Sequence, residues 1–259
     1  MRPNVAVSSD AALQGRLESR PGTPAITGPT GMRRLVANGR VEALLYVPPT
    51  YRPEVAAPLA VMLHGAGGDA EHGASLLRDH ADAHGLILVA PSSRAATWDL
   101  IVARYGRDVA AIDHVLGVVF DQYAIDPRRI ALGGFSDGAS YALSLGLGNG
   151  KLFSHLIAFS PGFAAYGTPA ARPRIFVSHG THDTVLPIDR CSRRLVVALE
   201  AGAFDVTYHE FDGPHTIPDP IAEAAIGWFL ADPAEQPETP AELQRDGHAV
   251  SPRAAEPAA

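Results

Sequence analysis

The chain has 259 residues, of which 46% are hydrophobic and 19% are charged, as in ordinary globular proteins. A chain of this length commonly forms one large α/β domain, and its core can hold the fold together without disulfides or a structural metal. The formal net charge of −7 argues against a nucleic-acid-binding surface. No stretch reaches the roughly 20 apolar residues that cross a bilayer, so we expect no membrane span. Cys191 is the single cysteine, which excludes an intrachain disulfide.

The two ends of the chain differ in composition from its middle. Residues 1–30 are rich in Pro, Gly, Ser and Thr and show no sustained period, which predicts an irregular arm. Residues 232–259 contain five prolines and almost no large apolar side chains, which predicts a disordered tail. We therefore expect the remaining residues, 31–231, to form a single domain. The N-terminal segment lacks the apolar core of a secretory signal, so we expect a cytoplasmic protein.

Short apolar runs alternate with helical patterns along residues 31–231. The runs predict strands at 41–47, 59–63, 86–90, 129–133, 155–159, 174–178 and 204–211. The helical patterns predict helices at 69–84, 106–123, 138–148, 189–201 and 218–230. Strands that alternate with helices indicate a mostly parallel sheet covered by helices on both faces. In such sheets ligands bind beyond the carboxyl ends of the strands, so functional motifs are expected just after strands.

The motif GFSDG (134–138) follows a predicted strand and opens a predicted helix. It matches the G-x-S-x-G pattern of a nucleophile elbow, in which a sharp turn projects one side chain above the sheet. The turn strains the backbone of Ser136, and the flanking glycines remove Cβ clashes. The alternative interpretation is an ordinary serine at a helix N-terminus.

The motif HGAGG (64–68) follows the predicted strand 59–63. Its glycines allow the backbone to turn beneath a substrate and to aim N–H groups at it. The N–H groups of Ala66 and Asp137 are candidates for an oxyanion hole. The sequence matches neither common phosphate-binding glycine motif.

An acid and a base are expected in the loops after the last two strands. Asp183 lies just past the predicted strand 174–178, and Asp189 and Asp212 are alternative acids, although Asp189 fits better as the N-cap of the next helix. His215 lies in a Gly/Pro loop after the strand 204–211 and is the candidate general base. His209 is the alternative base, but it lies within that strand.

These motifs resemble those of the α/β-hydrolase superfamily. Within it, they resemble most the motifs of the serine esterases of the phospholipase/carboxylesterase group and of the related polyhydroxybutyrate-depolymerase-like esterases. The resemblance spans about residues 40–230. The matching segments are LHGAGGD (63–69), GGFSDGASYAL (133–143), IAFSPG (157–162), VSHGTHDTVLP (177–187) and GPHTIP (213–218).

The resemblance implies an α/β-hydrolase catalytic domain at residues 31–231 and a carboxylic ester hydrolase without a cofactor. It implies that Ser136 is the nucleophile, His215 the base and Asp183 the acid, in the Ser…Asp…His order of this superfamily. One departure is Asp137, where many members of the group carry Gln. This difference weakens the transfer of a substrate from those enzymes.

The substrate pocket is less well defined by the sequence. Several apolar side chains fall in or near loops at the expected site, where core packing is an equally good interpretation; they are Trp98, Tyr105, Phe135, Phe163, Leu186 and Ile217. The loop at 91–106 is too short for a large cap domain, which predicts an open site for small esters. His80 and His84 lack the glutamate of a zinc helix, and no metal is expected.

Several functions share these motifs. Cleavage of short-chain or aryl carboxylic esters is the leading hypothesis, with a small-molecule ester as the partner. Thioesters, lysophospholipids and polyesters are alternatives for the same triad, as is acyl transfer to an alcohol or amine. A non-catalytic receptor that uses the same pocket is a further alternative. The sequence does not indicate an oligomeric state.

Overall fold

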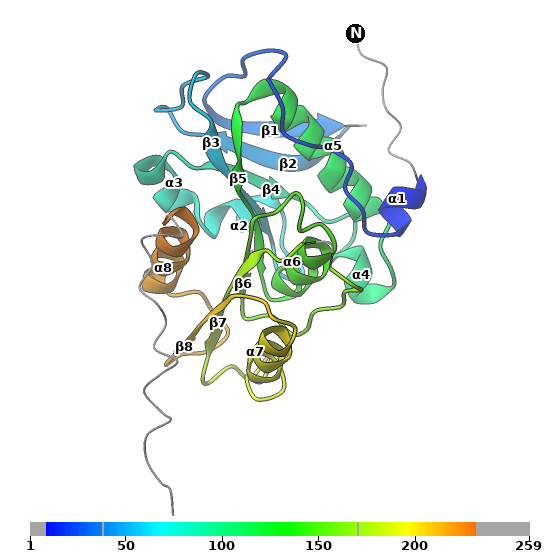
Figure 1. The fold of residues 1–259 in the computed structure, drawn as a ribbon, viewed down its shortest axis with the longest axis vertical. Coiled ribbons are helices and arrows are strands. Elements are labelled where there is room, and N and C mark those ends of the chain that lie inside the picture. Colours follow the sequence, from blue (N-terminus) through cyan, green and yellow to red (C-terminus); the bar gives the residue numbers. More distant parts are fainter. Residues whose placement is uncertain (1–8, 38, 170, 232–259) are drawn as a thin grey trace, which may run out of the picture.

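A computed structural model describes residues 9–37, 39–169 and 171–231, and the strands within these ranges form one sheet (Figure 1). Its order is β1-β2-β4-β3-β5-β6-β7-β8. The strands are β1 (Gly31–Ala37), β2 (Arg40–Val47), β3 (Ala57–Leu63), β4 (Ile87–Pro91), β5 (Ile125–Phe135), β6 (His155–Phe159), β7 (Arg174–Gly180) and β8 (Val206–Phe211). Every predicted strand overlaps an observed one.

The sheet is parallel from β4 through β8, whereas β1 and β2 run antiparallel to their neighbours. This confirms the prediction of a mostly parallel sheet. Strand β1 was not predicted, because it contains two arginines and has no continuous apolar run. Its residues alternate between half-buried and exposed, as expected of an edge strand.

Helices cover both faces of the sheet (Figure 1). They are α1 (Ser9–Leu13), α2 (Ala70–Ser75), α3 (Arg78–His84), α4 (Asp99–Val102), α5 (Arg107–Gln122), α6 (Asp137–Gly148), α7 (Ser192–Ala201) and α8 (Asp219–Leu230). Buried residues of α1, α5, α6 and α7 pack on one face. Helices α3 and α8 pack on the other, and α2 lies against β2 and β4.

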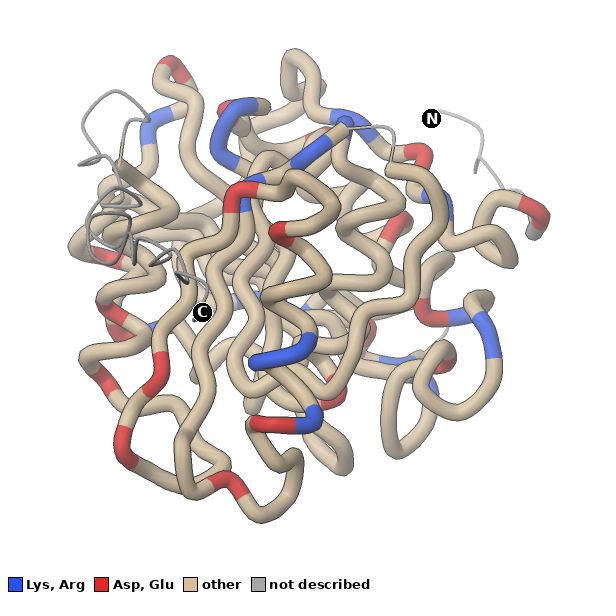
Figure 2. The backbone as a smooth tube through the Cα atoms, turned by 60° about the horizontal axis from the view of Figure 1, so that its bottom comes forward, with Lys and Arg blue, Asp and Glu red and all other residues tan. Residues whose placement is uncertain are grey.

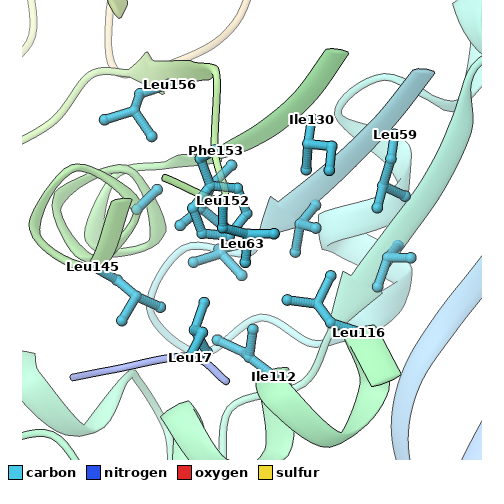
Figure 3. Packing of buried hydrophobic residues seen from close by; sticks show 14 of the residues in the cluster. Leu17, Leu59, Leu63, Ile112, Leu116, Ile130, Leu145, Leu152, Phe153 and Leu156 are labelled. Atoms are coloured by element: carbon cyan, nitrogen blue, oxygen red, sulfur yellow. The ribbon is translucent and has the colours of Figure 1, made fainter. Parts of the chain in front are cut away.

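The buried strands divide their side chains between the two faces. In β3, Leu59, Val61 and Leu63 belong to the core beneath α5 and α6, while Ala60 and Met62 belong to the core beneath α3 and α8. Figure 3 shows the first of these cores, in which leucines of β3 meet side chains of α5 and α6. This two-sided burial explains why the strands read as apolar runs in the sequence.

The predicted helix 69–84 is two helices, α2 and α3, separated at Leu76 and Leu77. A Cβ on Gly73 would lie 2.7 Å from the Met62 carbonyl oxygen, so α2 packs very close to β3. Leu77 at the break is fully buried and joins the core beneath α8. The break thus lets two short helices follow different parts of the sheet. As predicted, α3 ends at Gly85, which has a positive φ of 60°.

Helix α7 begins at Ser192, later than the predicted start at 189. The expectation that Asp189 is the N-cap is wrong, because Cys191 occupies that position. The Asp189 carboxylate accepts a hydrogen bond from the Arg193 guanidinium at 2.7 Å. A turn stabilised by bonds from the Arg190 and Cys191 N–H groups to the Pro187 carbonyl precedes the helix.

The described part of the predicted arm, residues 9–30, is docked on the domain. It contains α1, a short helix that the sequence analysis did not predict, and residues 14–30 have neither helix nor strand. The Asp113 carboxylate of α5 accepts hydrogen bonds from two backbone N–H groups of this segment. Leu17 is buried and packs beside α5 and α6 (Figure 3). The predicted tail at 232–259 lies outside the described residues.

Most charged residues lie outside this core, although the carboxylates of Glu42, Asp108, Asp113 and Asp183 are buried. Figure 2 shows long uncharged stretches through the central strands, with basic and acidic positions interspersed around them. In the described ranges, no helix has the length and apolar character needed to cross a bilayer.

A buried amide also holds the N-terminal segment, which gives a first prediction. The Asn149 side chain accepts the Leu17 N–H at 2.9 Å and donates to the Gly15 carbonyl at 2.7 Å. We expect Asn149→Ala to lower the free energy of unfolding by about 1–3 kcal/mol, because buried backbone groups lose their partners. Urea denaturation measures this change. The control Lys151→Ala alters an exposed residue nearby and is expected to change stability by less than about 0.5 kcal/mol. Equal stability of both variants would contradict the docking.

Candidate active site

Ser136 lies in a sharp turn between β5 and α6. Its backbone has φ 57° and ψ −119°, a conformation that costs a non-glycine residue free energy. The Ser136 N–H donates to the Phe159 carbonyl of β6 at 2.9 Å, which helps to hold this turn. The serine is nearly buried, with 9% of its surface exposed.

The glycines on either side of Ser136 are required by close backbone contacts. A Cβ on Gly138 would lie 2.3 Å from the Leu63 carbonyl oxygen and 2.4 Å from that of His64. A Cβ on Gly134 would lie 2.6 Å from the Leu63 carbonyl oxygen. Because real Cβ atoms do not approach backbone oxygens this closely, only glycine allows α6 to start directly against the end of β3.

Asp183 and His215 form a hydrogen-bonded pair. Asp183 follows β7 and His215 follows β8, and the His215 Nδ1 lies 2.5 Å from the Asp183 Oδ2. The other carboxylate oxygen, Oδ1, accepts the N–H groups of Val185 and Leu186, each at 2.8 Å. Nδ1 therefore donates to the carboxylate, and the lone pair of the neutral imidazole is left on Nε2.

The surroundings of Asp183 favour its ionised form. Burial alone would raise the pKa of this carboxyl group, but hydrogen bonds from Leu186, His215 and Val185 outweigh it and hold the pKa below its ordinary value. Asp183 is thus a carboxylate at neutral pH. It can orient the His215 ring and stabilise a positive charge on it.

The HGAGG loop lies beside the serine. A Cβ on Gly65 would be 3.5 Å from the Ser136 Cβ, and Ala66 next to it is exposed. The buried His64 ring anchors the loop, because its Nε2 accepts the Ser93 N–H at 3.0 Å. Burial lowers the pKa of His64, so it remains neutral in this role.

The segment between β4 and α5 supports both backbone groups predicted for the oxyanion hole. The Gly67 N–H donates to the Ala96 carbonyl at 2.6 Å, which fixes the residue after Ala66. The Thr97 hydroxyl donates to the Asp137 carboxylate at 2.8 Å. Asp137 is the first residue of α6, and the first helical hydrogen bond to Ser136 comes from Ser140, so the Asp137 N–H is not used within the helix.

A pocket of about 280 Å³ opens beside His215. Phe135 and Ile217 line it, and their predicted contact with substrate stays a prediction. The centroid of the Phe135 ring lies 4.6 Å from that of the His215 ring. Polar side chains of α2 and α8 complete the lining, among them His72, Ser75 and Asp219.

Similar proteins were found by comparison with family models, with curated sequences and with solved structures. A family model for phospholipase/carboxylesterase matches residues 106–225, which include Ser136, Asp183 and His215. A bifunctional acetylxylan esterase/xylanase from Neocallimastix patriciarum is 29% identical over 55% of this chain and 21% of its own length. An acyl-protein thioesterase 1 from Emericella nidulans is 32% identical over 41% of this chain and 48% of its own. The matched segments thus span less than half of either curated relative.

A solved phospholipase/carboxylesterase from Dyadobacter fermentans superimposes with a TM-score of 0.56 at 22% identity, covering 78% of this chain and 99% of the other. The chain has the α/β-hydrolase fold. This is the predicted fold, and residues 39–169 and 171–231 hold no large cap domain.

The alternative acids and base lie apart from the Asp183–His215 pair. Asp212 is exposed and pairs with the exposed His182 at 3.0 Å. The His209 ring stacks on Phe176 at 4.9 Å within the sheet. In the described part of the chain, no three His, Cys, Asp or Glu side chains are grouped to hold a metal ion.

The prediction of Trp98 as a substrate contact is wrong, because its side chain is fully buried. Its indole N–H donates to the His64 carbonyl at 2.9 Å, and its ring packs against Tyr141. Trp98 thus supports the HGAGG loop from within the core. Phe163 is partly exposed and Leu186 packs near Gly162, both outside the 280 Å³ pocket, and their contact with substrate stays a prediction.

The close approach at Gly138 gives a second prediction. We expect Gly138→Ala to lower the free energy of unfolding by about 1–3 kcal/mol, because the new methyl group forces the ends of β3 and α6 apart. Gly148→Ala at the other end of α6 is the matched control. A Cβ there meets no atom within 4 Å, so we expect stability to be unchanged or up to about 1 kcal/mol higher. Equal denaturation midpoints for the two variants would contradict the contact.

Proposed function

We propose that this protein is a serine esterase of the α/β-hydrolase superfamily that cleaves short-chain or aryl carboxylic esters through Ser136, His215 and Asp183. The observation that supports this most strongly is the common location of the three residues. They follow β5, β8 and β7, which belong to one continuous parallel part of the sheet, so all three lie at the same edge. The pairing of His215 with the Asp183 carboxylate supports the same proposal.

The first step is acylation of the serine. The Ser136 oxygen attacks the ester carbonyl carbon while His215 Nε2 takes the hydroxyl proton. The carboxylate of Asp183 stabilises the imidazolium that forms. Collapse of the tetrahedral intermediate breaks the bond to the alcohol oxygen, and His215 returns the proton to the departing alcohol. The acyl group remains on Ser136.

The second step is hydrolysis of the acyl-enzyme. His215 Nε2 takes a proton from water, whose oxygen attacks the acyl carbon, and the proton returns to Ser136 as the acid leaves. In both steps we propose that the N–H groups of Ala66 and Asp137 bind the oxyanion. One such donor contributes about 3–4 kcal/mol of transition-state stabilisation in other serine hydrolases.

The pocket supports a small substrate. Its volume of about 280 Å³ suits a short acyl or alcohol group, and no cap domain lies over it in the described ranges. The names of the curated relatives include both an acetylxylan esterase and an acyl-protein thioesterase. A thioester is therefore the second candidate, because the same triad and oxyanion hole accommodate a sulfur leaving group.

Removal of the nucleophile is the third prediction. We expect Ser136→Ala to reduce hydrolysis of p-nitrophenyl acetate by a factor of about 1,000 or more, because no acyl-enzyme can form. The control Ser154→Ala changes a serine at the opposite end of the sheet, just before β6, and is expected to retain activity. Activity that survives in Ser136→Ala would contradict the proposed nucleophile.

The pH dependence is the fourth prediction. Histidine must be neutral to act as a base, and free histidine titrates at about pH 6.5. The lowered pKa of Asp183 keeps this group ionised throughout the range, so kcat/KM should fall with decreasing pH as a one-proton transition. Full activity at pH 4 would contradict a histidine base.

Chain-length preference is the fifth prediction. Across p-nitrophenyl esters from acetate to laurate, we expect kcat/KM to be highest for the short acyl groups, because the pocket is small. A matched S-aryl thioacetate measures the thioester alternative. Marked activation by an emulsified triglyceride surface would contradict an open, lidless site.

A further inference from the structure

A second histidine contacts the same carboxylate as His215. His179 is the penultimate residue of β7 and is fully buried. Its Nε2 lies 3.1 Å from the Asp183 Oδ2 and 2.8 Å from the Leu186 carbonyl oxygen. Its Nδ1 lies 2.5 Å from the hydroxyl of Ser192, the first residue of α7.

These contacts define the protonation of His179. Nε2 faces two acceptors, a carbonyl and a carboxylate, so it carries the proton. Burial lowers the pKa of His179 and favours the neutral ring. In the neutral ring Nδ1 is an acceptor, and the Ser192 hydroxyl donates to it. Ser192 thereby selects the tautomer that points an N–H at Asp183.

We propose that His179 is a positioning residue for the triad, which rests on the proposed function of Ser136, Asp183 and His215. With His179, four N–H groups face the Asp183 carboxylate: two on Oδ1, and those of the His215 and His179 rings on Oδ2, the His179 N–H being shared with the Leu186 carbonyl. This arrangement fixes the rotation of the carboxylate and hence the plane of the His215 ring. The donor on Oδ2 also disperses the negative charge that faces His215.

Other titratable groups near His179 come from the neighbouring strand and helix. Glu210 of β8 is the register partner of His179, and its carboxylate is held by the Arg193 guanidinium of α7 at 2.8 and 2.5 Å. The thiol of Cys191 lies at the start of α7, where burial raises its pKa and keeps it neutral. These groups add an ion pair and a neutral thiol around His179, besides Asp183 and His215.

Paired substitutions of His179 separate its hydrogen bond from its packing. His179→Gln keeps an N–H near the position of Nε2, whereas His179→Leu fills a similar volume without a donor. Ser192→Ala removes the group that selects the tautomer and leaves the ring in place. The control His182→Gln changes an exposed histidine in the loop after β7, which pairs with Asp212. Thermal unfolding of each variant establishes that it is folded.

Two readouts are measured for each variant. The first is kinetic, kcat and KM with p-nitrophenyl acetate, and the second is the titration of the His215 ring by NMR. We expect His179→Leu to lower kcat roughly 10- to 100-fold with KM within about twofold, because the base is misoriented. The midpoint of the His215 titration should rise by roughly half a pH unit, because Oδ2 then directs more negative charge at the imidazolium. His179→Gln should restore most of both values, and Ser192→Ala should give an intermediate kcat.

The outcomes distinguish this proposal from the proposed function. Unchanged kcat and an unchanged His215 midpoint in His179→Leu would overturn the positioning proposal. An equal loss of kcat in folded His179→Gln and His179→Leu would also overturn it, because that result indicates that His179 acts through packing alone. If His179→Leu does not fold, the decision falls to Ser192→Ala, and wild-type values there would overturn the proposal. If the wild-type protein hydrolyses no ester, the proposed function fails, while the His215 titration still tests the positioning.

Discussion

The close crossing of β3, β5 and α6 is the constraint on which the rest of the site depends. Gly138 lies so near the Leu63 and His64 carbonyl oxygens that a side chain cannot be accommodated. This contact forces the chain to turn sharply at Ser136, with a positive φ, and lets the helix begin directly beside the HGAGG loop. The same contact therefore places the serine, the first N–H of α6 and the Ala66 backbone next to one another.

Two buried polar clusters support this turn from opposite sides. On one side, the segment after β4 holds the HGAGG loop through Gly67, His64 and Trp98, and holds Asp137 through Thr97. On the other side, the loop after β7 surrounds the Asp183 carboxylate with N–H donors. Both clusters consist of groups whose hydrogen bonds are largely satisfied inside the protein, which keeps the reacting groups in place without a bound substrate. The strain at Ser136 is affordable because these contacts restrict every neighbouring segment.

Much of the fold could be predicted from the sequence, because strands buried on both faces leave apolar runs and strand ends leave Gly-rich motifs. The loops that carry Ser136, Asp183 and His215 were predicted from this pattern and lie at one edge of the sheet. The pattern does not reveal β1, whose half-exposed edge position requires no apolar run, or the break between α2 and α3, which arises from packing against the sheet. Trp98 and His179 show the same limit at the site. The residue type of Trp98 suggested a substrate contact, and no role was predicted for His179, because tertiary hydrogen bonds decide the environment of both side chains.

The identity of the residue that becomes covalently modified tests the proposed nucleophile most directly. A fluorophosphonate that reacts with activated serines is incubated with the full chain, which is then digested with trypsin and sequenced by tandem mass spectrometry. Cleavage after Arg129 and Lys151 yields a peptide with three serines, at positions 136, 140 and 144. We expect one adduct on Ser136, and its loss after substitution of His215 by alanine. An adduct on another residue, or none on a folded protein, would contradict this expectation.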